Sequence, residues 1–284
     1  MNLKVVGLSE SAAKAESLAE FDRPIDRQME IGLLKSGLQG AAHRAECCMG
    51  WVWRQWLLGT PRAVISKRIE PFVERGLELR RRCRSYDYLA VHDLFLLHCA
   101  IFTSNEALLK AVAEGIADAS GDKDTKPLDR GRGELYAAAW CGLMKYWILG
   151  QQENAVEQSD LIWKAYRDNT VFAASKLLAV PWLKRDWKAF AKAQKKDFEK
   201  LWNRARKDCW TIKAESSGLT VVTTERYQIG HQWCWAHCGM ALLAHREGVE
   251  VVTDPFWFPA SAIANPKAQA DRKRLNDPNQ LEML

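Results

Sequence analysis

We predict an all-α fold from this sequence: an irregular array of about ten helices, with at most one or two short strands near the C-terminus. Apolar residues recur at steps of three and four through most of the chain, which is the period of helices with one buried face. Glycine and proline interrupt this pattern, as expected for helices joined by short links. Because no clean 34- or 40-residue repeat is present, the sequence does not predict a regular helical solenoid.

The first part of the chain begins with small and polar residues, which predict one short helix within residues 1–20. Pro24 suits a helix start, and an apolar stripe from Ile31 to Trp56 carries the second helix to about residue 58. Gly59 suits a C-terminal cap, and Pro61 suits the first turn of the next helix. The helices expected after this turn span 61–83, 88–102 and 105–119, and the turn-rich segment 120–127 predicts an exposed loop.

The second part continues with helices at 134–149, 153–166, 171–178, 181–206 and 226–246. We expect Pro181 to open the helix 181–206, because proline fits the first helical turn. Gly150 and Gly248 suit the ends of two of these helices. Residues 216–224 are rich in Thr and Val and are the best strand candidate, and residues 249–253 form a second, shorter extended piece.

The domain organisation follows from the length of 284 residues, which is near the upper limit for one compact core. We therefore expect a single helical domain over residues 1–284. Two closely packed halves, 1–119 and 130–264, are the alternative division. Residues 265–284 are predicted to form a polar tail.

Tryptophan and cysteine are both abundant, with 13 and 8 residues respectively. Most Trp residues lie in apolar helical stretches and predict core packing, with a minority as exposed anchors for a partner. Free cysteines next to apolar residues behave as small hydrophobic side chains. The N-terminus lacks the apolar core of a signal peptide, and the longest apolar run, 135–149, is too short for a membrane span and contains Lys145. We therefore expect a cytoplasmic protein with reduced cysteines.

A metal site is suggested by four residues that share one stripe of the expected last helix: His231, Cys234, Cys238 and His245. Seven residues of helix span about 10.5 Å, whereas the ligands of one zinc ion lie about 2.0–2.3 Å from it. Only adjacent members of the stripe could share an ion, and further ligands would have to come from the set His92, His98 and Cys99. We predict core packing and no metal.

Catalytic motifs are not apparent in the sequence. It contains no Gly-rich phosphate loop, no His-Glu-x-x-His and no nucleophile elbow. Paired carboxylates such as Glu70 and Glu74 fit a solvated helix face with basic neighbours. We therefore expect no enzymatic activity, no catalytic residues and no cofactor.

A basic helix face is the strongest surface signal. Between Lys184 and Lys207 there are ten Lys and Arg against three acidic residues, although the whole chain has a net charge of only +6. The basic face has three interpretations: it is only solvated, it docks an acidic protein, or it binds a nucleic acid. The modest net charge of the chain favours the nucleic acid least. The candidate partner-binding residues are Arg185, Lys188, Lys192, Lys196 and, from an aromatic turn nearer the C-terminus, Trp257.

The segment 233–254 combines a Trp- and Ala-rich helix, a basic residue, Gly, a short hydrophobic piece and Asp, and Pro259 follows it. This pattern resembles the C-terminal part of bacterial immunity proteins, particularly the Immunity protein 49 family. The resemblance implies a helical protein that neutralises a cognate toxin, an effector of bacterial competition, by direct contact. Such neutralisation needs a complementary surface that buries about 1,200–2,000 Å² and needs no catalytic residues.

We therefore expect an immunity protein whose partner is a cognate toxin. An α-helical, repeat-like adaptor or regulatory interaction protein is the alternative, and an enzyme that depends on a metal or a cysteine is the third interpretation.

Overall fold

The computed structural model describes residues 2–6, 8–19, 39–82, 89–116, 132–165, 170–207, 211–214, 219–223 and 235–263. Within these ranges the chain forms ten α-helices, three short strands and one 3₁₀ turn. This confirms the all-α class. The predicted loop 120–127 and the predicted tail 265–284 lie outside the described residues, as does the first part of the predicted helix 24–58.

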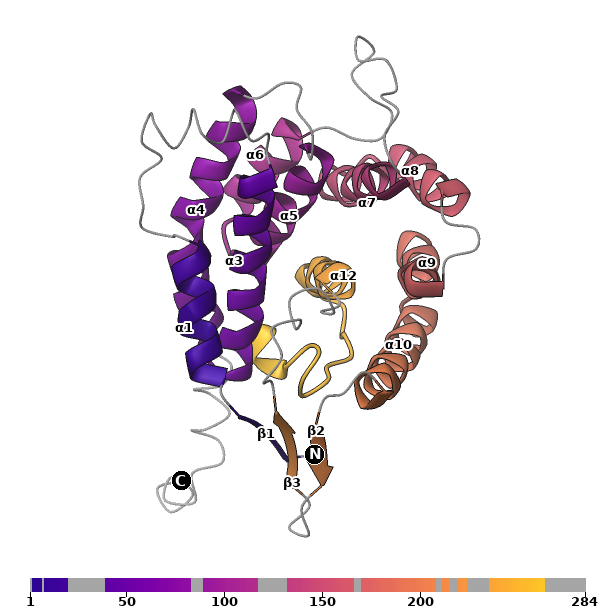
Figure 1. Cartoon of the computed structure of the whole chain (residues 1–284). Helices are drawn as coiled ribbons and strands as arrows, with labels where there is room; N and C mark the ends of the chain where they lie inside the picture. The colour runs from indigo at the N-terminus through magenta and orange to yellow at the C-terminus, as the bar shows by residue number, and fades with distance from the viewer. Residues whose placement is uncertain are drawn as a thin grey trace, which may run out of the picture.

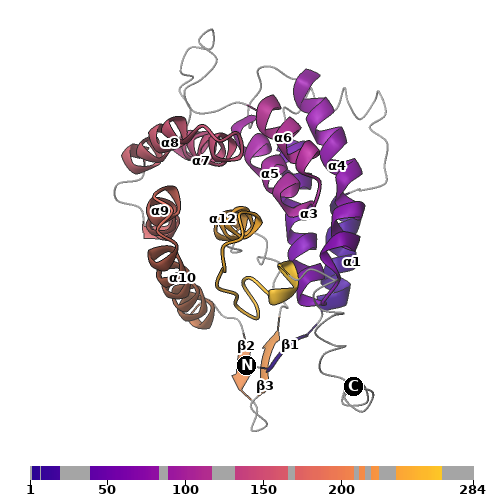
Figure 2. The same cartoon turned by 180° about the vertical axis from the view of Figure 1, so that it is seen from behind.

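The helices of the N-terminal part pack side by side as one block (Figures 1 and 2). Helix α1 packs against α3, α3 packs against α5, and α4 packs against both α5 and α6. Most of their inward positions are apolar and buried, as the spacing of three and four residues predicts. The bounds of these helices are α1 Leu8–Ala19, α3 Gln39–Leu57, α4 Arg62–Arg82, α5 Leu89–Phe102 and α6 Glu106–Gly115.

The following helices continue the array in a curve (Figure 1). Helix α7 packs on α5 and α8, α8 packs on α9, and α9 packs on α10. Helix α12 lies at the centre of this curve in both views and contacts α5 and α9 (Figures 1 and 2). The bounds are α7 Arg132–Ile148, α8 Gln152–Ala165, α9 Thr170–Leu183, α10 Trp187–Lys207 and α12 Trp235–Arg246.

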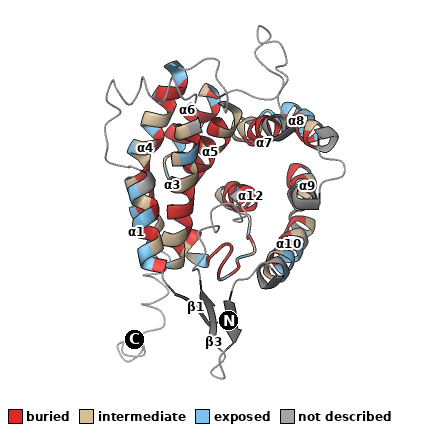
Figure 3. Cartoon of the chain, in the orientation of Figure 1, coloured by how far each residue is buried: buried red, intermediate tan, exposed pale blue. Residues whose placement is uncertain are grey.

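The central position of α12 explains its composition. Most of its described side chains are buried, and Figure 3 shows it almost entirely in the colour of buried residues. A helix that is apolar on every side needs neighbours on every side, and the curved array supplies them. The buried side chains form one continuous hydrophobic core that runs from α1 to the segment after α12.

Tryptophan is a major component of this core, as predicted. Aromatic pairs in it include the stacked rings of Trp147 and Trp182, whose centroids are 3.9 Å apart. Among the residues whose burial is described, the tryptophans that are at most 9% exposed are Trp51, Trp53, Trp56, Trp140, Trp147, Trp182 and Trp257.

A small sheet lies at one end of the array (Figure 1). Its strands are β1 (Asn2–Val6), β2 (Thr211–Ala214) and β3 (Leu219–Thr223), in the order β1-β3-β2. Strand β3 lies inside the predicted strand 216–224. It pairs in parallel with β1, with Asn2 opposite Leu219, and antiparallel with β2. The prediction of at most two strands near the C-terminus missed β1, because a short strand that pairs with a distant segment carries little local signal. The predicted extended piece 249–253 does not form a strand.

The boundary between α9 and α10 also differs from the prediction. Pro181 lies inside α9, and the chain turns at residues 184–186 instead. Arg185 adopts a φ of 54°, and the N–H of Asp186 donates to the Pro181 carbonyl at 2.9 Å, as in a helix C-terminal motif. Asp186 then accepts from the N–H of Ala189 at 3.0 Å and caps α10. The capping aspartate, and not the proline, therefore determines where α10 begins.

The five described cysteines that carry free thiols are Cys47, Cys48, Cys99, Cys141 and Cys238. All except Cys47 are buried, in agreement with the prediction that they pack as small hydrophobic side chains. The remaining three cysteines lie outside the described side chains. None of the described helices is both long and apolar enough to cross a membrane.

Candidate partner-binding site

Helix α10 presents the predicted basic face to solvent. The side chains of Lys188, Lys192 and Lys196 are exposed, as are those of Lys195 and Lys200. The opposite side of the helix is built into the core through Phe190 and Phe198. The predicted basic face is therefore confirmed as exposed, and the helix has a buried apolar side opposite it.

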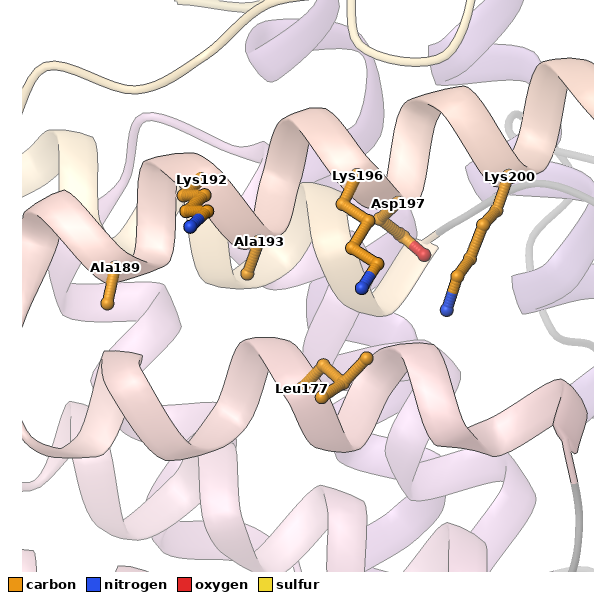
Figure 4. Close-up of a pocket in the computed structure, with 7 residues that line it drawn as sticks. All are labelled: Leu177, Ala189, Lys192, Ala193, Lys196, Asp197 and Lys200. Carbon is orange, nitrogen blue, oxygen red and sulfur yellow. The ribbon is translucent and has the colours of Figure 1, made fainter.

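A groove runs between α9 and α10 beneath part of this face. Its volume is about 190 Å³, and its lining combines small apolar, aliphatic, basic and acidic side chains. Figure 4 shows the lysines along α10 with Leu177 facing them from α9, and the Asp197 carboxylate between Lys196 and Lys200. The lining residues are Leu177, Ala189, Lys192, Ala193, Lys196, Asp197 and Lys200.

Three groove lysines form a row with a fixed spacing. Lys192, Lys196 and Lys200 follow one another at intervals of four residues, which places their Cα atoms about 6 Å apart along the helix axis. Within the part of the chain that the structure describes, none of the three is in an ion pair. Their positive charges are therefore available to a partner.

An aliphatic side chain adds to the groove. Leu177 is 49% exposed and is one of four large hydrophobic residues exposed among the described side chains. Sequence reasoning did not find this residue, because the adjacent Leu178 is buried and the helical pattern alone does not say which face lies beside α10. Asp197 was also not predicted to contribute to the site.

A buried hydrogen-bond network holds the base of the groove. Nδ1 of His237 lies 2.9 Å from Oδ2 of Asp197, and Nε2 of His237 lies 3.0 Å from the amide nitrogen of Gln194. The Gln194 Oε1 accepts from the N–H of Val252 at 3.2 Å, so its amide nitrogen faces the imidazole as a donor. His237 therefore accepts at Nε2 and donates from Nδ1. Because both ring nitrogens are engaged and the residue is 2% exposed, this His–Asp pair cannot act as a general base on an external substrate.

Arg185 has a role within the fold. Its guanidinium lies 3.7 Å from the Glu247 carboxylate and 5.3 Å from the centre of the Trp147 ring. The first contact connects the turn before α10 to the end of α12, and the second connects it to α7. Arg185 is exposed but does not line the groove, and neither does Lys188.

Trp257 does not belong to any accessible site, and its prediction as a partner-binding residue is wrong. The side chain is 1% exposed, and its neighbours Phe256 and Phe258 are fully buried. The Asp254 carboxylate accepts from the N–H groups of Phe256 and Trp257 at 2.9 and 2.8 Å, which folds the segment into a tight turn. Trp53 donates to the Phe256 carbonyl at 2.7 Å and fixes the turn against α3. The aromatic turn is therefore core.

Two of the residues considered for zinc, Cys238 and His98, are buried and make hydrogen bonds to backbone carbonyls in the core. Cys238 is buried and donates to the Trp257 carbonyl at 3.5 Å. His98 contacts the Leu94 carbonyl at 2.7 Å through Nδ1, and burial lowers its pKa to about 4. His231 and Cys234 lie outside the described residues, and among those described no three His, Cys, Asp or Glu side chains converge as metal ligands would.

No protein-family model matches this chain, and neither the curated proteins nor the solved structures contain a match to it.

Proposed function

We propose that this chain is an immunity protein that binds and neutralises a cognate toxin by direct contact, with the basic face of α10 as its docking surface. The observation that carries the proposal is the row of ion-pair-free lysines next to the exposed Leu177. This surface lies on a helix whose opposite side packs in the core. The positions of the lysines along the helix are therefore fixed before a protein partner binds. The resemblance of residues 233–259 to immunity proteins supplies the kind of partner.

Charge steering gives this surface a specific function. Lysines on one exposed face raise the association rate with an acidic partner and make that rate depend on salt. Neutralisation by contact requires a stable scaffold and a complementary surface. We place this function in the cytoplasm as part of the same proposal.

The test uses the product of the gene adjacent to this one as the candidate toxin. The two proteins should co-elute, and co-expression should relieve the growth inhibition caused by the toxin alone. Lys188→Glu, Lys192→Glu and Lys196→Glu together should slow association and weaken its salt dependence. These positions are exposed, so the variant should fold normally.

A matched control reverses three exposed basic residues on other helices: Lys67, Arg81 and Lys110. Both triple variants lower the formal net charge from +6 to 0, since each reversal removes two charges. Equal association rates for the two variants would show that the α10 face is only solvated. Binding without relief of growth inhibition would instead favour the adaptor or regulatory protein.

A further inference from the structure

The groove between α9 and α10 combines a basic wall with an apolar part, and both restrict the kind of partner that can bind there. One wall is the row of Lys192, Lys196 and Lys200, and the apolar part comprises Leu177, Ala189 and Ala193. A partner that fills it must therefore present carboxylates and aliphatic side chains in two parallel rows, because the two kinds of surface lie next to each other along the same helix pair (Figure 4).

An α-helix has this arrangement. Its residues at i and i+4 repeat about every 6 Å, which matches the spacing of the three lysines, and the i+3 and i+7 positions form an adjacent row on the same face. A strand also repeats at about 6.7 Å between residues i and i+2. However, all residues on one strand face fall in a single row, so an acidic row leaves no aliphatic row for Leu177.

Other anionic surfaces fit the groove less well. An amphipathic helix binds a membrane through an exposed apolar face, but the apolar face of α10 is buried through Phe190 and Phe198. A nucleic-acid backbone carries a charge at every residue and would place phosphates beside the Asp197 carboxylate, which lines the groove. A helix can place a neutral side chain there.

We propose that the groove binds an acidic amphipathic helix of the partner, with carboxylates on Lys192, Lys196 and Lys200 and an aliphatic side chain on Leu177. The inference rests on the proposed function, because it specifies the part of the toxin that docks. It assigns Leu177 to the interface, and a purely electrostatic face does not require this residue.

The probe is a fluorescent, hydrocarbon-stapled helical peptide of about 15 residues, which is long enough to pass all three lysines. Glu residues occupy one i, i+4, i+8 row, and Leu residues occupy the adjacent row. A control peptide of the same composition places the two rows on opposite faces. We expect saturable binding of the first peptide, measured by fluorescence anisotropy. The control peptide should bind at least about tenfold more weakly, since it cannot contact the lysines and Leu177 at the same time.

Protein variants test the two walls separately. Lys192→Glu with Lys196→Glu should weaken binding by about tenfold or more, since both contacts change from attraction to repulsion. Leu177→Ser should weaken it severalfold without changing its salt dependence. The control variant Lys67→Glu with Lys110→Glu carries the same charge change on α4 and α6 and should bind like the wild type. Circular dichroism confirms that each variant is folded.

Absence of saturable binding, equal affinity for the two peptides, or insensitivity to Leu177→Ser would overturn the inference. Tighter lysine-dependent binding of a single-stranded oligonucleotide, or of vesicles rich in phosphatidylserine, would overturn it in favour of a polyanion site. Failure of the two proposals is distinguishable. If the toxin is neutralised equally well by all groove variants, the docking surface on α10 and the docking helix are both contradicted, and the immunity function is retained. Peptide binding without toxin neutralisation contradicts only the immunity function.

Discussion

His237 donates from Nδ1 to the carboxylate of Asp197 across 2.9 Å, and this bond joins the central helix α12 to the basic helix α10. The imidazole also stacks on Phe198 of α10 at a centroid distance of 4.3 Å. His237 and Asp197 are both at most 7% exposed, so the Asp197 carboxylate depends on the imidazole for a buried hydrogen bond. The position of the basic face is thus fixed by a polar contact in addition to the apolar stripe.

Replacing His237 with Phe should test this contact directly. Phe preserves the stacking on Phe198 but leaves the Asp197 carboxylate without its donor, which should lower the free energy of unfolding by about 1–3 kcal/mol. Urea unfolding measures the loss. In a double-mutant cycle with Asp197→Ala, the two losses should be strongly non-additive, because the second change removes the unpaired carboxylate. Additive losses would mean that the bond contributes nothing.

The stability of the protein should fall in mild acid because of His98. This residue is fully buried, and burial lowers its pKa from 6.5 to about 4. The unfolded chain therefore binds a proton between pH 6.5 and 4 that the folded chain does not, so stability is lost as the pH falls through this window. The contribution should be about 3 kcal/mol at most. His98→Leu should have a smaller loss of unfolding free energy over the same window, as measured by urea unfolding at each pH. An identical pH dependence would exclude this role.

The turn that buries Trp257 should depend on Asp254. Its carboxylate accepts from the N–H groups of Phe256 and Trp257 and from Nε1 of Trp202 at 2.8 Å. Asp254→Ala should lower the free energy of unfolding by about 3 kcal/mol, since it removes all three bonds. Asp254→Asn should cost less, because its oxygen still accepts from the backbone. Unfolding monitored by Trp fluorescence measures both, with the exposed Glu250→Ala as the control. Equal stability of all three variants would show that the turn needs no carboxylate.

Cys47 and Cys48 should react slowly with thiol reagents until the protein unfolds. Burial, with a smaller contribution from the Glu46 carboxylate, raises the pKa of Cys47 to about 11, and burial together with the neighbouring Cys99 thiol raises the pKa of Cys48. Since the thiolate is the reactive form, Ellman's reagent should label these two cysteines of the folded protein slowly at pH 8. Denatured, freshly purified protein should show all eight thiols. A lower number would reveal disulfides or a bound metal and contradict the expectation of reduced cysteines.

Within the described residues, the sequence was sufficient to predict the helices, apart from the boundary between α9 and α10, and the side that α10 buries. The stripe Phe190, Gln194 and Phe198 is buried as its spacing predicts, and Gly59 and Gly248 end helices with positive φ values of 75° and 83°. These features are local: a helix repeats every 3.6 residues, and a glycine accepts a left-handed conformation wherever it stands. Local sequence also set the exposure of Lys192 and Lys196, which lie opposite that stripe.

Only the tertiary structure decided which segments that are distant in the sequence contact each other. The pairing of Asn2 with Leu219 joins segments more than 200 residues apart. The burial of Trp257 requires α3 and α10 to converge on its turn, and the groove requires α9 to bring Leu177 beside the lysines of α10. Each depends on contacts between distant segments, whose free energy is realised only when the chain has folded. A helical or aromatic pattern within one segment therefore cannot specify them.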